Sequence, residues 1–140
     1  MPISTLTTVY SLVEAIAEKV HNLGSDTLKV ALTNSAPSQS NTVLANITEI
    51  SYTNCSARTL TVSSSAQSSG TYKLVVADLV LTASGGSVGP FRYAVIYNDT
   101  ATNDELIGYY DYGSSITLAD GETLTLDFDG ANGVFTLAFS

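Results

Sequence analysis

The feature that most constrains the fold of this chain is a succession of short strand-forming segments separated by turns rich in glycine and serine. Residues 122–128 (ETLTLDF) show the pattern clearly, because Leu124, Leu126 and Phe128 alternate with polar neighbours. Successive side chains of a strand point to opposite faces of a sheet, so the alternation predicts one face on a core and one face in water. Such segments favour an antiparallel β-sandwich or a barrel.

Similar segments recur along the chain at intervals of about 8 to 12 residues, the spacing typical of a sandwich. They predict about seven or eight strands. The predicted strands are residues 27–33, 58–64, 71–82, 91–98, 105–112, a short stretch near 116, 122–128 and 134–139. Residues 34–41 predict a polar loop, and residues 43–51 fit a helical turn as well as an extended chain.

Residues 91–98 (FRYAVIYN) differ from the other segments because both of their faces carry apolar side chains. Phe91, Tyr93, Val95 and Tyr97 form one face, and Ala94 and Ile96 add apolar area to the other. The second face therefore has to be covered by a helix, a loop or another chain, and a partner surface is one interpretation of it.

One amphipathic helix is predicted near the N-terminus, over residues 11–23. Ser11 and Glu14 have the spacing of a capping box, and Gly24 supplies a stop. Apolar residues recur between them at helical spacing: Leu12, Val13, Ile16, Val20 and Leu23. The helix either packs over the sheet or docks on a partner. Residues 1–8 are uncharged and rich in threonine, and they predict a flexible arm that extends onto a neighbour.

A chain of 140 residues fits a single domain with one core, which here spans residues 1–140. Acidic residues outnumber basic ones by 13 to 5, giving a formal net charge of −8. This sign opposes binding to nucleic acid, and the scattered basic residues oppose attraction to an anionic membrane, so neither is an expected partner. Residues 1–20 lack the basic and apolar regions of a secretory signal, and synthesis in the cytoplasm is expected.

Enzymatic chemistry finds little support in the sequence. His21 is the only histidine, and a solvent-facing or dipole-stabilised role is expected for it. Cys55 is the only cysteine and lacks the basic neighbours that activate a thiolate, so it is expected to pack. One cysteine and one histidine cannot close a zinc site. The chain is therefore predicted not to be an enzyme, with no catalytic, cofactor-binding or metal-ligating residue.

Carboxylates crowd the C-terminal hairpin, where the sequence holds Asp120, Glu122, Asp127 and Asp129. Residues 127–132 (DFDGAN) set two of them and Asn132 beside glycine, an arrangement open to a hard cation, although the spacing differs from an EF-hand. Acidic residues that shape a hairpin are the preferred interpretation. A glycosidase pair drawn from Asp111, Asp120 or Glu122 is the weaker alternative, because that mechanism depends on a defined carboxylate separation.

Three tyrosines, Tyr109, Tyr110 and Tyr112, are candidates for interface anchors, because a tyrosine combines buried area with a hydrogen-bonding tip. Packing in the core or at a sheet edge is an equal alternative for them.

Several longer phrases carry a resemblance to a known family: KVALTNSAP (29–37), ITEIS (47–51), the run from TVSSSAQSSG to YAVIYNDT (61–100), LIGYYDYG (106–113) and LADGETLTLDFDGANGVFTLA (118–138). From about Leu28 to its C-terminus, the chain resembles the head decoration, or cement, proteins encoded with tailed-phage capsid genes, and more specifically that of a short-tailed phage infecting Bordetella.

The resemblance implies a jelly-roll-like antiparallel β-sandwich that binds the outside of an icosahedral capsid. Its expected partners are the major capsid protein, whose neighbouring subunits it would bridge, and a second copy of itself in a homodimer. The expected location is the outer surface of the virion. No catalytic residue is carried over. A receptor- or glycan-binding β-module of a phage tail is the alternative function, since it would share the sandwich and the missing active site.

Overall fold

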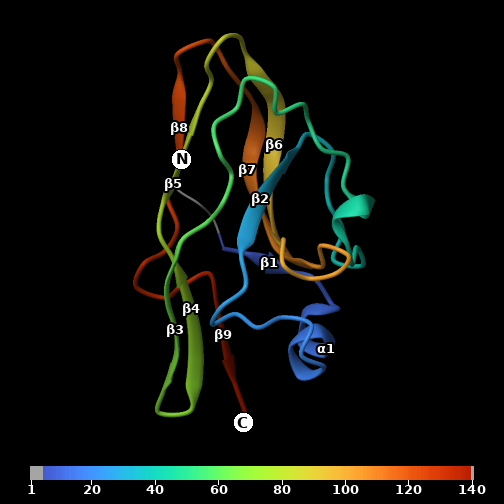
Figure 1. The fold of residues 1–140 in the computed structure, drawn as a ribbon, viewed down its shortest axis with the longest axis vertical. Coiled ribbons are helices and arrows are strands. Elements are labelled where there is room, and N and C mark those ends of the chain that lie inside the picture. The colour runs from blue at the N-terminus through green and yellow to red at the C-terminus, as the bar shows by residue number, and fades with distance from the viewer. Residues whose placement is uncertain (1–4, 140) are drawn as a thin grey trace.

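The computed structural model describes residues 5–139 as a mainly β fold with one short α-helix (Figure 1). In chain order, its elements are β1 (Thr7–Thr8), α1 (Leu12–Ala17), β2 (Leu28–Thr33), a 3₁₀ helix (Leu44–Asn46), β3 (Val62–Ser68), β4 (Thr71–Val76), β5 (Leu79–Thr82), β6 (Val88–Asn98), β7 (Leu106–Leu118), β8 (Thr123–Leu126) and β9 (Phe135–Ala138). The mainly β class predicted from the sequence is confirmed.

The strands form three antiparallel sheets around a shared core. The largest sheet has the order β1-β7-β6-β2, the second has the order β3-β4-β9, and β5 pairs with β8. One hydrophobic cluster joins all three sheets, as Val30, Leu74 and Leu81 illustrate. This arrangement is consistent with a β-sandwich. Leu126 and Phe128 are buried in the core, as their alternation with polar residues predicts.

The strand β6 is buried on both faces, and this chain itself supplies the cover. Val95 and Ile96 point to opposite faces, and both are inaccessible to solvent. The connection between β2 and β3 crosses the sheet to reach β1 and β7, where Gln39 Nε2 donates to Thr8 O at 2.9 Å and Leu106 N donates to Thr42 O at 2.9 Å. It returns to β2, where Ile50 N donates to Leu32 O at 3.0 Å. A loop therefore covers the second apolar face predicted for residues 91–98.

The predicted strand 58–64 serves two sheets. Its first part lies along the outer edge of β2, where Val30 N donates to Arg58 O and Leu60 N donates to Leu28 O. Its second part enters β3, which begins at Val62 and runs four residues beyond the predicted end. The outer edge of β2 is thereby closed by the chain itself.

Two other predicted strand boundaries are wrong. Residues 71–82 form β4 and β5 rather than one strand. The strand is interrupted at Ala77 and Asp78, where Ala77 N donates to Thr61 O and Asp78 Oδ1 accepts from Phe128 N at 2.9 Å. The segments predicted at 105–112 and near 116 form the single strand β7, which pairs with β6 through several register shifts. Both strand boundaries are set by pairing with residues that lie far away in the sequence.

The helix is shorter than the predicted span 11–23, since α1 ends at Ala17. Lys19 adopts a left-handed conformation (φ 65°), which turns the chain back so that Leu23 is buried outside any helix. The predicted capping box is also wrong, because Ser11 has helical backbone angles and makes no side-chain capping bond. Val13 lies on the exposed side.

The flexible arm predicted over residues 1–8 is wrong for its last three residues. Leu6 is buried, and Thr7 and Thr8 pair with Tyr109 and Gly108 of β7. Residues 1–4 lie outside the described part of the chain.

Gly108 allows β1 to lie close to β7, and a side chain there is expected to destabilise the fold. A Cβ atom at this position would lie 2.6 Å from Thr7 O and 3.0 Å from the Leu6 side chain. We expect Gly108→Ala to lower the free energy of unfolding by about 1–3 kcal/mol in urea denaturation, because overpacking forces β1 to shift. Gly130→Ala is the control, since its added Cβ meets nothing within 4 Å. Equal stability of the two variants would contradict the close approach.

Candidate functional site

His21 and Asn98 are buried side by side in a polar cluster, whose half-buried acidic members are Asp26 and Glu105. The side chain of His21 is only 6 % exposed, so the solvent-facing role expected for it is wrong. The turn at Lys19, which ends α1 early, carries the imidazole inward beneath the end of β6. No signal in the local sequence distinguishes this burial from the predicted helical exposure.

Asn98, which is fully buried, uses its whole side chain in this cluster. Its Nδ2 donates to His21 Nδ1 at 3.0 Å and to Asp26 Oδ2 at 2.7 Å. Its Oδ1 accepts from the backbone N–H groups of Thr100 and Ala101. One side chain therefore joins the segment after α1 to the turn between β6 and β7.

The hydrogen bonds of the cluster define the tautomer of His21. An amide nitrogen only donates, so Nδ1 of His21 accepts and the neutral ring carries its proton on Nε2. Burial lowers the pKa of His21, although the negative charges of Glu105 and Asp26 oppose this change. In this arrangement the amide occupies Nδ1 and the bond joins the segment after α1 to the end of β6.

The acidic turn after β8 is held by its own hydrogen bonds. Asp129 Oδ1 accepts from the N–H groups of Ala131 and Asn132, and Asp129 Oδ2 accepts from Asn132 Nδ2, each at 2.9 Å. These bonds lower the pKa of Asp129. The geometry agrees with the preferred interpretation of acidic residues that shape a hairpin. Within residues 5–139, no group of three or more histidine, cysteine, aspartate or glutamate side chains is placed to hold a metal ion.

The three carboxylates considered as a glycosidase pair each stabilise a separate contact. Asp111 pairs with Arg92 through Nε at 2.8 Å, and this bond lowers the pKa of Asp111. Asp120 accepts from Gly85 N at 2.9 Å, and Glu122 accepts from Ala119 N at 2.6 Å. The last two bonds are backbone caps of the turns beside β5 and β8.

Cys55 packs against the core and is half-buried, as predicted. Burial raises the pKa of its thiol, and the nearby charge of Arg58 opposes the change only in part. A thiol with a raised pKa is a poor nucleophile at neutral pH.

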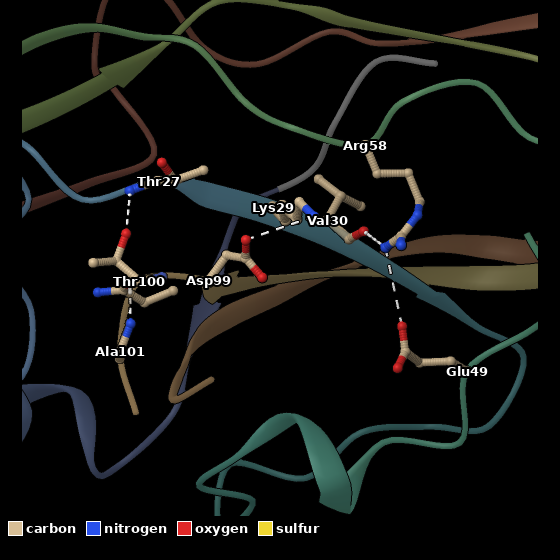
Figure 2. Close-up of polar contacts among 9 residues, drawn as sticks. Thr27, Lys29, Val30, Glu49, Arg58, Asp99, Thr100 and Ala101 are labelled. Atoms are coloured by element: carbon tan, nitrogen blue, oxygen red, sulfur yellow. Dashed lines mark hydrogen bonds and ion pairs between the residues drawn. The ribbon is translucent and has the colours of Figure 1, made fainter. Parts of the chain in front are cut away.

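The connection that covers the sheet is fastened to β2 by Tyr52, Arg58 and Glu49. The guanidinium of Arg58 stacks over the Tyr52 ring at 3.5 Å and donates to Val30 O at 2.6 Å. Figure 2 shows Arg58 between Val30 and Glu49, and the distance from Arg58 Nη1 to Glu49 Oε1 is 4.0 Å. Tyr52 Oη accepts from Leu32 N at 2.9 Å and donates to Glu49 Oε1 at 2.7 Å. These contacts hold the connection at the outer edge of β2.

A second set of polar contacts joins the start of β2 to the end of the adjacent strand β6 (Figure 2). Thr27 N donates to Thr100 Oγ1 at 2.8 Å, and Lys29 lies 3.6 Å from Asp99. The Lys29–Asp99 pair is partly exposed, so its contribution to stability is small.

The three tyrosines proposed as interface anchors lie in different environments. Tyr110 is buried and packs on Phe128 with ring centroids 5.8 Å apart, so it belongs to the core. Tyr109 is half-buried and interacts with Tyr10 and Tyr93. Tyr112 is exposed. The three tyrosines therefore do not share one surface, and only Tyr109 and Tyr112 reach solvent.

Two large apolar side chains lie exposed at the start of α1, which the sequence pattern did not indicate. Tyr10 and Val13 are 68 % and 66 % exposed, and their spacing of three residues places them on one side of this turn. The half-buried Tyr109 interacts with both Tyr10 and the half-buried Tyr93. We call these four residues the N-terminal surface. The helical spacing of the apolar residues had predicted Val13 on the buried side of a helix, so the sequence did not indicate this surface.

Comparison with known proteins adds no relative to these observations. The sequence matches no family model, no curated protein and no solved structure. Among the described residues, none of the helices combines the length and apolar character that crossing a membrane requires.

Removing the Tyr52 hydroxyl is expected to loosen the connection over the sheet. We expect Tyr52→Phe to lower the free energy of unfolding by about 1–3 kcal/mol, because the N–H of Leu32 loses its acceptor in a partly buried position. Tyr112→Phe, which removes the hydroxyl of an exposed ring, is the matched control and should unfold at the wild-type urea concentration. Equal losses in the two variants would argue against the fastening role of Tyr52.

The burial of His21 predicts a defined pH dependence of stability. Its folded-state pKa is lowered from 6.5, so the unfolded chain binds a proton more readily. The free energy of unfolding should therefore be highest above pH 6.5 and fall as the pH drops towards the lowered folded-state pKa. Urea titrations across this range check it, and His21→Gln should remove this part of the slope. An unchanged slope in the variant would contradict the assignment to His21.

Proposed function

We propose that this protein is a capsid decoration protein, which binds the outside of an icosahedral phage head and bridges neighbouring major capsid subunits. The sequence phrases between Leu28 and Ala138 support the proposal through their resemblance to cement proteins. The observation that carries it in the structure is the N-terminal surface, where large side chains stay exposed although the chain buries both faces of its central strand.

The N-terminal surface suits a protein partner. Tyrosine is enriched at protein interfaces because its ring supplies apolar contact area while its hydroxyl forms hydrogen bonds. The backbone of Tyr10 is held in place, since its N–H donates to Gln39 O at 2.9 Å and the N–H of its neighbour Val9 donates to Ile107 O. An exposed ring on a fixed backbone loses little conformational entropy when it binds.

Binding of this kind stabilises a shell by mass action. A protein that binds the assembled shell better than free subunits favours assembly, and about 100-fold excess over Kd corresponds to roughly 2.7 kcal/mol at each site. If the bound unit touches two subunits, the second contact forms at a high effective concentration. Two copies related by a two-fold axis would present the same surface twice and suit a two-fold position of the lattice.

The exposed Tyr10 ring also favours the alternative function, a receptor- or glycan-binding module of a phage tail. An aromatic ring with a polar tip provides an apolar platform and a hydrogen-bonding group, which are the elements of a small-ligand site. The same surface would then contact a sugar or a cell-surface receptor instead of a capsid.

The capsid proposal predicts saturable binding to phage heads that lack the protein. We expect the purified wild-type protein to co-sediment with such heads and to increase the fraction that survives heating or low salt. Tyr10→Ser combined with Val13→Ser should weaken binding about tenfold or more, because exposed aromatic anchors dominate interface energies. Val80→Ser is the matched control, since Val80 is 51 % exposed on β5, in a different sheet.

Failure of the folded wild-type protein to bind these heads would overturn the capsid role. Binding to glycans or host cells under the same conditions would then favour the tail module. If the Tyr10 and Val13 variant binds heads as well as the Val80→Ser control does, the N-terminal surface is not the contact.

A further inference from the structure

The strand β3 is an uncovered edge of the second sheet. The sheet order β3-β4-β9 places β4 on one side of β3 and no described strand on the other. Most of its side chains are exposed, and between Val62 and Ser68 it contains neither a charge nor a proline. Proteins usually protect a free edge with charged residues, proline or a covering segment, so an unprotected edge of this length is a pairing site.

Two other strand edges, those of β2 and β5, are covered by the chain itself. Residues 58–60 lie along the outer edge of β2, as described above. Ser56 covers β5, since its N–H donates to Thr82 O at 3.0 Å and its Oγ accepts from Thr82 N at 2.9 Å. The β3–β4 hairpin instead extends away from the largest sheet, with its turn at one end of the molecule (Figure 1).

The turn of this hairpin determines which backbone groups face outward. Ser69 and Gly70 both have positive φ angles, 50° and 83°, as a two-residue turn of type I′ requires. Such a turn makes Ser68 and Thr71 a hydrogen-bonded pair, and hydrogen-bonded pairs alternate along an antiparallel ladder. The pairs Ser65–Leu74 and Gln67–Tyr72 are therefore not hydrogen-bonded. Consequently, the N–H and C=O groups of Ser65 and Gln67 point away from β4, towards solvent.

The charge of this sheet is compatible with a second copy of this acidic chain at the β3 edge. The protein has 13 acidic residues, yet β3, β4 and β9 contain none of them. Their single charged side chain is Lys73. Two copies of a chain with a net charge of −8 repel one another, and strands that carry no acidic side chain do not add to that repulsion.

We propose that β3 pairs antiparallel with β3 of a second copy of this chain about a two-fold axis at Ala66. Ser65 of each copy then lies opposite Gln67 of the other, and their outward N–H and C=O groups form the inter-chain hydrogen bonds. Ala66 faces Ala66 in the closely spaced pair, where a small side chain fits. The two hairpins join into one continuous sheet with three strands from each copy. This association does not depend on the capsid role, because it is a property of the isolated protein.

Charge placed at Ala66 tests the pairing without disturbing the bonds between β3 and β4. In sedimentation velocity over a concentration series, we expect the wild-type protein to form a dimer. Ala66→Glu and Ala66→Lys should each raise the dimer Kd about tenfold or more, since each sets like charges opposite one another across the axis. An equimolar mixture of the two variants should form a heterodimer at the wild-type concentration. Ala138→Glu is the matched control, because Ala138 is an exposed alanine on β9, the opposite edge of the same sheet.

Recovery of the dimer in the mixture cannot result from misfolding, so it would support the β3 edge directly. A wild-type protein that stays monomeric throughout the series would overturn the proposal. A dimer that Ala138→Glu disrupts while both Ala66 variants leave it intact would also overturn it, and would move the contact to β9.

Discussion

The fold depends most on the buried side chain of Asn98. A fully buried amide costs free energy unless each of its groups is hydrogen-bonded, and here both donors and the acceptor oxygen are used. These bonds link His21 and Asp26, which follow α1, to the turn that leads from β6 into β7. The early end of α1, the burial of the imidazole and the position of β7 beside β6 are therefore parts of one arrangement. A hydrophobic residue of similar size would leave each partner with a lost bond.

The second constraint is that the central sheet has apolar residues on both faces, and this chain covers both of them. The core lies on one side, and the connection held by Tyr52 and Arg58 lies on the other. Apolar area therefore does not remain where the alternation of β6 first indicates it. Large apolar side chains stay exposed at Tyr10 and Val13, although the N–H of Tyr10 donates to Gln39 O within that connection. The proposed capsid contact and the proposed pairing at β3 occupy separate sheets, so one unit would have surfaces for a partner and for its own copy.

The strand pattern was predictable because it is local. Alternation in residues 122–128 and in 91–98 depends on the period of an extended chain, which neighbours in space do not alter. The site was less predictable. Helical spacing of Val13, Val20 and Leu23 indicated a buried stripe, but the left-handed turn at Lys19 ended the helix, exposed the first of these residues and buried the last by another route. Propensity gave way to tertiary contacts that only the folded chain supplies.

The sequence by itself determined that the chain is acidic, is mainly β and has an alternating core strand, because charge and two-residue periodicity are properties of the residues and of the extended backbone. Only the tertiary structure decided which edges are covered, that Tyr110 lies in the core while Tyr10 faces solvent, and that Asp129 is bound by its own turn. These outcomes depend on contacts between residues far apart in the chain. Within residues 5–139, the outward backbone groups of Ser65 and Gln67 have no such contact, whereas the side chain of Asn98 has four.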